Sequence, residues 1–144
     1  MEDWKERPIA FACSSDMEIG QLVAASRGYR GSGFILMLKN DGMLVERLLP
    51  AYMNAKIRHM EDGMRANSVQ MEMLLFVAGT MRLEKAIERA GASDHGNFMV
   101  FASERKGIRE FAREAGIRIM EEYGLKLDLD IAVDVASAGL VDES

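Results

Sequence analysis

The spacing of apolar residues between Asn67 and Ala92 predicts two helices joined at a glycine. The first helix is expected to start at Asn67 or Ser68, whose side chains can accept hydrogen bonds from unpaired amides, and to end near Ala78. Its apolar side chains lie on both sides of the helix: Met71, Leu74, Leu75 and Ala78 on one, and Val69, Met73, Phe76 and Val77 on the other. A helix that is apolar all round has to be covered on both faces, by its own domain alone or by its own domain and a partner.

The second helix of the pair, Met81 to Ala90, is amphipathic. Gly79 suits the left-handed residue that ends the first helix, and Thr80 can cap the second. The apolar positions that follow a helical period are Leu83, Ala86, Ile87 and Ala90. A DNA-binding helix-turn-helix would need apolar residues where this chain has Lys85 and Glu88, so a corner of two helices inside a core is the favoured interpretation.

The other hydrophobic runs predict strands and helices on either side of this pair. Strands are expected at 8–14, 34–38 and 97–102, with a further short strand at 117–119. Helices are expected after Ser15 or Asp16, over 43–60 and, with Ser103 as its cap, over 104–115. Pro50 lies inside the second of these helices and predicts a kink there or two shorter helices. Residues 125–129 are expected to form an edge strand or to lead into a last helix, capped by Asp128, that ends at Gly139.

These elements predict an α/β fold, with a small mixed sheet of three to four strands packed with about six to seven helices. At 144 residues the chain is long enough for one domain, so 1–144 is expected to be a single domain with flexible ends at 1–7 and 140–144. No apolar run approaches the roughly 20 residues that a membrane span needs. Because Met1 to Pro8 has no apolar signal core, we expect a cytoplasmic protein.

The charge of the chain is unevenly distributed, so its acidic total does not exclude a polyanionic ligand. The net charge is −5, but 121–144 alone carries seven acidic residues and one lysine, or −6, so the first 120 residues carry +1 (−5 minus −6). Arg105, Arg109 and Arg113 recur along one face of a predicted helix and could follow phosphates, although a solvated helix face is the alternative. A glycine-rich loop at 27–33 places Tyr29 beside Arg30, a pattern compatible with single-stranded RNA or with a plain turn.

The sequence contains no recognisable catalytic or metal-binding pattern. The glycines of 27–33 precede a strand rather than a helix, the reverse of the order that a phosphate-binding loop requires. Cys13 is the only cysteine and falls in an apolar strand, where a thiol is normally inert. Asp94 and His95 form the one pair that could serve as an acid and base or hold a metal. We expect no cofactor, no metal and no enzymatic activity.

The run from Ala66 to Ala92 resembles the signature of the small kinase-binding subunit of the KEOPS complex, the PRPK-binding protein family (TPRKB), of the archaeal type. The matching positions are Asn67, Ser68, Glu72, Leu74, Leu75, Gly79, Leu83, Ala86, Ile87, Gly91 and Ala92. The chain departs from the family pattern at the turn, where Ala78 replaces a serine and Met81-Arg82 stands where Arg-Gln is usual.

This resemblance implies a non-catalytic regulatory subunit that binds the small atypical kinase/ATPase subunit of KEOPS. The complex makes the N6-threonylcarbamoyladenosine modification of tRNA, and archaeal members of the family are thought to hold the single-stranded 3′ tail of tRNA. The alternatives are a free-standing nucleic-acid-binding regulator that uses the 67–92 helix pair and a small-molecule enzyme at Asp94 and His95.

The residues indicate where such partners would bind. The partner surface is expected to be apolar and helical, so the candidates for kinase binding are Met71, Met73, Leu74, Leu75, Phe76 and Val77. The candidates for RNA binding are Tyr29, Arg30, Arg82, Lys85, Arg89, Arg105, Arg109 and Arg113.

Overall fold

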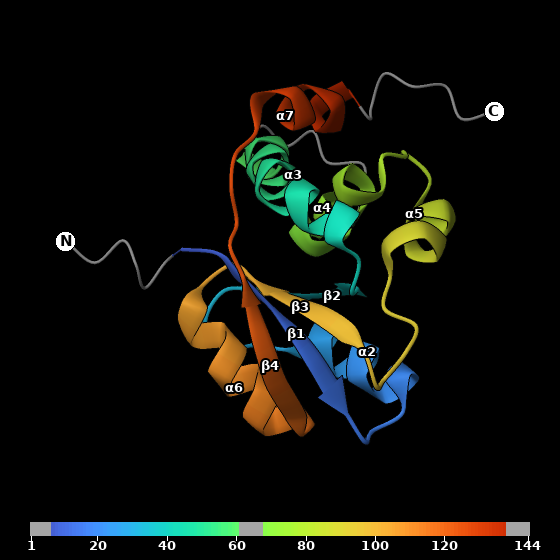
Figure 1. The fold of residues 1–144 in the computed structure, drawn as a ribbon, viewed down its shortest axis with the longest axis vertical. Helices are drawn as coiled ribbons and strands as arrows, with labels where there is room; N and C mark the ends of the chain where they lie inside the picture. The colour runs from blue at the N-terminus through green and yellow to red at the C-terminus, as the bar shows by residue number, and fades with distance from the viewer. Residues whose placement is uncertain (1–6, 61–67, 138–144) are drawn as a thin grey trace. The chain divides into compact units, whose positions relative to one another are not determined.

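The computed structural model describes residues 7–60 and 68–137, which fold as two compact units (Figure 1). Unit 1 comprises residues 1–41 and 92–125, and unit 2 comprises 42–91 and 126–144. Apart from Arg7, the ends predicted to be flexible lie outside the described residues, as do the cap at Asn67 and the predicted helix end at Gly139. No helix within the described ranges is long and apolar enough to cross a membrane.

Unit 1 is built on a four-stranded sheet. Its strands are β1 (Ile9–Ser15), β2 (Ile35–Lys39), β3 (Phe98–Ala102) and β4 (Ile117–Tyr123), in the order β2-β3-β1-β4. The predicted small α/β fold is confirmed, and the strand count is at the upper end of the prediction. Strand direction is the detail that differs from the predicted mixed sheet, since all three pairings are antiparallel.

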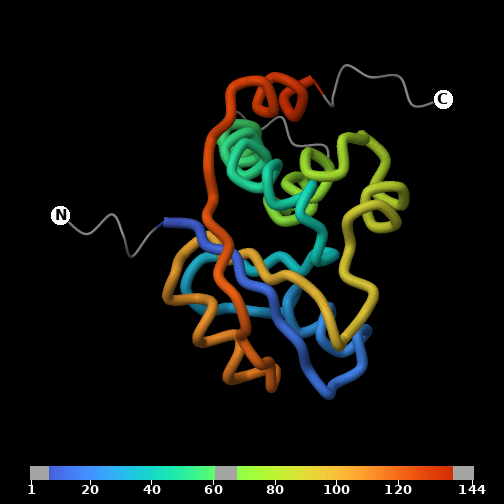
Figure 2. Tube along the Cα trace, in the orientation of Figure 1, coloured from blue at the N-terminus to red at the C-terminus, as the bar shows by residue number. Residues whose placement is uncertain are grey.

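Two helices, α2 (Ile19–Gly28) and α6 (Arg105–Ala115), pack with this sheet around the core of unit 1. The order β1-α2-β2 followed by β3-α6-β4 is a split βαβ arrangement, in which each half places a strand between the two strands of the other. Figure 2 shows β1 and β4 running side by side although a hundred residues separate them in the chain. The core contains apolar side chains from both helices and three strands, among them Leu22, Phe111, Cys13, Met37, Phe98 and Val100.

The last strand, β4, is longer than predicted, and the segment after it leads into a helix. β4 continues to Tyr123 because a bulge opposite Ala12 lets it stay paired with β1 while its register shifts. Residues 125–129 form no strand. Asp128 instead caps α7 (Leu129–Ala136) by accepting hydrogen bonds from the amides of Asp130 and Ile131 at 2.9 and 3.2 Å.

Unit 2 is helical, with α3 (Gly42–Met60), α4 (Val69–Ala78), α5 (Leu83–Ala90) and α7. α4 packs against α3 and α5, and α3 also packs against α7. The predicted first helix is confirmed: Ser68 caps α4, and Gly79 ends it in the left-handed conformation. The second helix starts later than predicted, at Leu83, and Thr80 does not cap it: Arg82 occupies the cap position, and its amide donates to the Thr80 hydroxyl at 3.1 Å. The alternative of two short helices at Pro50 is wrong, because α3 continues through this residue, and the Asn54 side chain donates to the Pro50 carbonyl at 2.8 Å.

Candidate functional site

The apolar residues of α4 form the core of unit 2 rather than a surface. Met73, Leu74, Leu75, Phe76 and Val77 are at most 3% exposed, and Met71 is half-buried. The hypothesis that the first five contact a partner is therefore corrected, since their side chains could be reached only if the unit opened. α4 packs against α3 and α5.

A charged group lies within this core. Glu72 is completely buried in the first turn of α4, and its Oε2 is 3.8 Å from Nε of Arg58 on α3. The guanidinium of Arg58 also lies over the ring of Phe76, 5.9 Å from its centroid. A carboxylate in the first turn interacts favourably with the helix dipole, which helps explain why a charge is tolerated there. Its burial follows from the packing of other elements against α4, which the sequence did not reveal.

Arg47 of α3 joins three helices of unit 2. Its Nε donates to the carbonyl of Val77 at 2.7 Å and its Nη2 to the carbonyl of Phe76 at 3.1 Å, so it satisfies acceptors at the unpaired end of α4. Its Nη1 forms an ion pair with Asp134 of α7. Sequence reasoning missed this role, because nothing local marks one arginine among the charged positions of α3.

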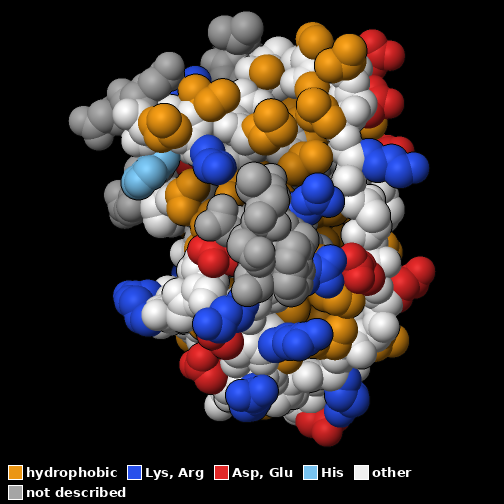
Figure 3. Space-filling view, turned by 90° about the vertical axis from the view of Figure 1, so that its left-hand side faces the viewer, with side chains coloured by type: hydrophobic (Ala, Val, Ile, Leu, Met, Phe, Trp, Pro, Cys, Tyr) orange, Lys and Arg blue, Asp and Glu red, His pale blue; other side chains and the backbone are white. Residues whose placement is uncertain are grey.

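The surface of unit 2 that could receive a partner lies on α3 and α7. Met53, Ile57 and Met60 recur with helical spacing on α3 and are 43%, 52% and 80% exposed, opposite the buried Leu48 and Ala55. On α7, Leu129 and Val133 are 75% and 70% exposed. We call these five residues the α3–α7 surface, and Figure 3 shows hydrophobic side chains gathered over this part of unit 2.

The sequence analysis did not identify the α3–α7 surface. The signal was present, because Met53, Ile57 and Met60 follow the i, i+4, i+7 period. The same period is typical of a core face, however, and only the packing of Leu48 and Ala55 shows which of the two apolar faces of α3 is inside.

Tyr29 is not available to stack on a base. It is 7% exposed, its ring meets that of Phe111 edge-on, and its hydroxyl donates to Glu110 of α6. Burial, followed by the hydrogen bond to Glu110, raises the pKa of Tyr29. The same hydrogen bond is the main reason why the pKa of Glu110 is lowered. The prediction that Tyr29 binds RNA is therefore corrected.

The glycine-rich loop is held against α6 rather than mobile. Glu110 Oε1 also accepts a hydrogen bond from the Ser32 amide at 3.0 Å. A Cβ at Gly31 would lie 2.2 Å from the Tyr29 hydroxyl, and a Cβ at Gly107 would lie 2.6 Å from the Ser32 carbonyl, so both positions require glycine. Arg30 is exposed on this loop, and its guanidinium donates to the carbonyl of Tyr29 at 3.1 Å.

Ser103 serves the same junction instead of capping α6 as predicted. Its hydroxyl accepts a hydrogen bond from the Phe34 amide at 2.8 Å, while Glu104 occupies the cap position of α6 without a side-chain hydrogen bond. Side chains in and just before α6 therefore accept hydrogen bonds from the backbone amides of the loop and of the residue after it.

The cations of α6 lie on its outer face but are not equivalent. Arg105 is half-buried and pairs with Glu122 of β4 at 3.3 Å. Arg109 and Arg113 are exposed. These two therefore present more charge to solvent than Arg105 does.

The cations of α5 lie near its two ends. Arg82 precedes the helix and pairs with Glu84 at 2.9 Å, and Arg89 in the last turn donates to the carbonyl of Ala78 at 3.4 Å. Lys85 is half-buried between them. The structure thus places the candidate RNA-binding cations in two groups, one on each unit.

Asp94 and His95 lie in an exposed turn before β3. The Asp94 carboxylate accepts a hydrogen bond from the Gly96 amide at 2.9 Å, which is a turn-forming contact. The His95 ring nitrogen Nδ1 lies 2.6 Å from the carbonyl of Ser15. Within the described residues, no group of three histidine, cysteine or acidic side chains could hold a metal ion. Both residues thus have a local structural role in forming this turn.

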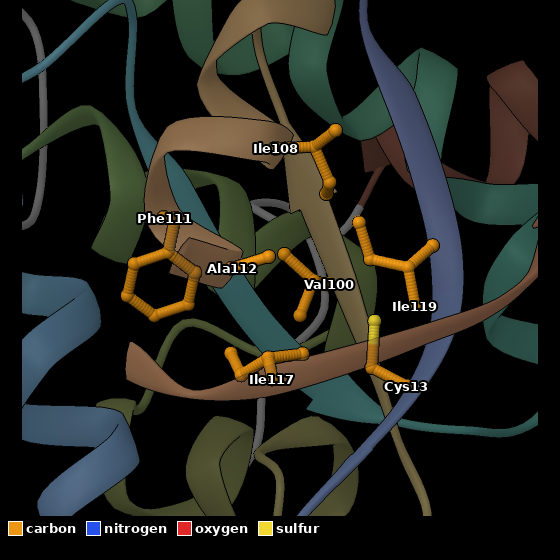
Figure 4. Close-up of a pocket in the computed structure, with 7 residues that line it drawn as sticks. All are labelled: Cys13, Val100, Ile108, Phe111, Ala112, Ile117 and Ile119. Atoms are coloured by element: carbon orange, nitrogen blue, oxygen red, sulfur yellow. The ribbon is translucent and has the colours of Figure 1, made fainter. Parts of the chain in front are cut away.

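A small apolar gap lies between α6 and the sheet (Figure 4). It is lined by Cys13, Val100, Ile108, Phe111, Ala112, Ile117 and Ile119, and it leaves no room for a water molecule. Burial raises the pKa of Cys13 to about 12, so its thiol stays protonated and unreactive at neutral pH. This gap is part of the core packing and offers no polar group to a ligand.

Comparison with known proteins adds no family assignment. A scan against protein-family models finds none that matches this chain, and a search of curated proteins finds no match either.

Proposed function

We propose that this protein is a non-catalytic regulatory subunit of the KEOPS complex, which makes N6-threonylcarbamoyladenosine in tRNA. In this proposal it acts in the cytoplasm, binds the small atypical kinase/ATPase subunit and helps to bind the single-stranded 3′ tail of tRNA. The proposal combines the resemblance of 66–92 with the exposed apolar helical surface of unit 2.

The residues that carry the resemblance have definite structural roles. Ser68 caps α4, Glu72, Leu74 and Leu75 are buried in it, and Gly79 provides the left-handed turn. These five residues therefore specify how α4 begins, packs and ends, whereas Leu83 and Ile87, which also match the family pattern, are 38% and 42% exposed on α5. A partner must then bind to a surface that this core supports.

The α3–α7 surface is the observation that carries the proposal. Exposed apolar side chains that recur on one face of a helix, as Met53, Ile57 and Met60 do, are typical of a site that another molecule covers. Fully burying a side chain of the size of valine, leucine, isoleucine or methionine stabilises a complex by about 1.5–3 kcal/mol before the costs of association. Five such side chains are therefore sufficient for the central part of a protein interface.

The proposed tRNA contact involves exposed cations of both units. Arg30, Arg109 and Arg113 are exposed on unit 1, and Arg82 and Arg89 are exposed on unit 2. Arginine in such positions attracts the phosphate backbone without reading sequence. This attraction weakens as salt rises, because releasing counterions into a more concentrated salt solution yields less free energy.

Co-purification tests the kinase contact. The tagged protein is purified from its own host at moderate salt and compared with two isoleucine variants, Ile57→Asp on the α3–α7 surface and Ile87→Asp on α5. Ile87 is a matched control because it is 42% exposed on a helix of the same unit but lies outside the α3–α7 surface. We expect the kinase subunit to be recovered with the wild type and Ile87→Asp but not with Ile57→Asp. Equal recovery with both variants would remove the α3–α7 surface from the proposal, and recovery of the wild-type protein alone would reject the kinase partner.

Binding to tRNA is tested separately. Arg109→Gln with Arg113→Gln should weaken binding of tRNA and reduce the dependence of affinity on salt by about one unit of log–log slope for each arginine. Arg105→Gln is the control on the same helix, because Arg105 is paired with Glu122. Unchanged affinity and slope in the double variant would exclude α6 from the RNA contact.

A further inference from the structure

The methionines that the structure describes range from fully buried to largely exposed. Twelve methionines are unusually many for 144 residues, and their position decides what each can do. Met73 and Met99 are fully buried, as core methionines should be. Met53 and Met60 are 43% and 80% exposed on α3, where a soluble helix would normally carry polar side chains.

The exposed thioethers of α3 are part of a larger apolar group. Met53 and Met60 lie on either side of Ile57 along the helix, and α7, which packs against α3, exposes Leu129 and Val133. Both sulfur atoms thus belong to side chains that a partner would bury together with three unreactive aliphatic ones. A chemical change at sulfur would alter the polarity of the whole surface.

We propose that Met53 and Met60 are reversible oxidation sites that switch the α3–α7 surface between an apolar and a polar state. The oxidant is a peroxide, which transfers one oxygen atom to the thioether: the sulfur forms an S–O bond and loses two electrons, the O–O bond breaks, and water is released. The product is methionine sulfoxide, which methionine sulfoxide reductases return to the thioether.

The physical effect is expected on binding and not on folding. A sulfoxide oxygen is a strong hydrogen-bond acceptor that water satisfies on the free surface, so the folded chain is not destabilised. Covering the same oxygen with apolar side chains of a partner removes that water, and a buried polar group without a hydrogen bond is costly. Oxidation therefore weakens binding of a partner to the α3–α7 surface and leaves the stability of the free chain unchanged. As far as it concerns the kinase subunit, this inference rests on the proposed function.

The first experiment measures the modification on the protein alone. The full chain is treated with limiting hydrogen peroxide, the oxidised methionines are identified by peptide mass spectrometry, and retention on a hydrophobic interaction column is recorded. We expect Met53 and Met60 to be oxidised before Met73 and Met99 and the retention to fall. The Met53→Leu, Met60→Leu double variant should lose much less retention after peroxide than the wild type, since the exposed Met43, Met81 and Met120 are oxidised in both proteins. Met120→Leu is the control, since Met120 is 65% exposed but lies on β4 of unit 1, and this variant should lose retention as the wild type does.

Two results would overturn the inference: oxidation of Met73 and Met99 as fast as that of Met53 and Met60, or an equal fall in retention for the double variant and the wild type. Circular dichroism before and after treatment identifies a loss of retention that comes from altered folding, which would also count against it.

The second experiment separates this inference from the proposed function. Affinity for the purified kinase subunit is measured before and after peroxide, and we expect oxidation to weaken it by roughly tenfold in the wild type and to have no effect in the double variant. A wild type that does not bind the kinase subunit before treatment rejects the proposed partner, whereas the retention result still decides the oxidation sites. Binding that survives complete oxidation of Met53 and Met60 would reject the switch while leaving the partner in place.

Discussion

Helices α4 and α3 lie side by side in unit 2 and differ in what their sequences reveal. α4 has the most recognisable sequence of the chain but little accessible apolar surface, because its side chains from Met73 to Val77 are buried and Met71 is half-buried. α3 has an unremarkable sequence and the larger part of the α3–α7 surface. A recognisable motif can therefore mark the residues that specify a fold, while the binding surface lies on the neighbour that the motif positions.

The largest effect on stability is expected from Phe76→Ala in α4. Phe76 is one of the largest fully buried side chains, so its removal leaves a cavity and should lower the free energy of unfolding by about 3–5 kcal/mol. Urea denaturation measures this loss. A loss below about 1 kcal/mol would contradict the assignment of α4 as the core of unit 2.

A smaller loss is expected from Arg47→Met, which keeps most of the side-chain length but removes the donors to the end of α4. The carbonyls of Phe76 and Val77 lose their partners, which should cost about 1–3 kcal/mol. Asp134→Asn is the matched control, since it removes only the charge of an exposed partner and should cost at most about 1 kcal/mol. Equal losses in the two variants, measured by denaturation, would show that Arg47 contributes to stability through its ion pair with Asp134 and not through its hydrogen bonds to the end of α4.

The junction of Tyr29 and Glu110 predicts how the stability of unit 1 depends on pH. The pKa of Glu110 is lowered on folding, so its contribution is present above the usual glutamate pKa of about 4.3 and is lost as the pH falls through the lowered value. The pKa of Tyr29 is raised, so its contribution is present below the usual tyrosine pKa of about 10 and is lost as the pH rises towards the raised value.

Unfolding measured across pH in the wild type, Tyr29→Phe and Glu110→Gln checks both signs. Glu110→Gln should lose the acid dependence, whereas Tyr29→Phe should lose the alkaline dependence and also weaken the acid dependence, because the hydrogen bond from Tyr29 is the main cause of the lowered pKa of Glu110. Tyr29→Phe should also leave tRNA affinity unchanged, because the ring is buried; weaker RNA binding by this variant would restore Tyr29 as a contact.

The smallest effect on stability is expected from Ile57→Asp on α3. The side chain is half exposed and is not part of the buried face, so the free energy of unfolding should change by no more than about 0.5 kcal/mol. Thermal or urea denaturation of this variant beside Phe76→Ala gives the contrast between the two helices directly. A loss as large as that of Phe76→Ala would mean that the outer face of α3 belongs to the core.

Much of the secondary structure followed from local pattern. The strands at Ile9–Ser15, Ile35–Lys39 and Phe98–Ala102 lie within one residue of the predicted ranges. The cap at Ser68 and the turn at Gly79 also follow from local rules, because a hydroxyl that accepts from an amide three residues on and a glycine free to adopt positive φ need no distant partner. The antiparallel direction of the sheet could not be inferred in this way, since it depends on which strands become neighbours.

The candidate site was less predictable than the fold. Periodicity identified α4 as apolar on both sides but could not distinguish burial by its own unit from burial by a partner. Tyr29 shows the same limit, since its position beside Arg30 suggested RNA binding until Glu110 and Phe111, about eighty residues away, were seen to enclose it.

Local pattern along the chain was enough to predict the strands at Ile9–Ser15, Ile35–Lys39 and Phe98–Ala102, the two ends of α4, and the inertness of a lone cysteine in an apolar strand. The packing of distant segments was needed to show that α4 is enclosed and that Arg47 donates to the carbonyls at its end. The same holds for the burial of Tyr29 against α6 and for the apolar side chains that α3 and α7 expose. The reason is physical: hydrogen-bonded periodicity is set by residues within one or two turns, whereas burial is set by what packs against a face from elsewhere in the chain.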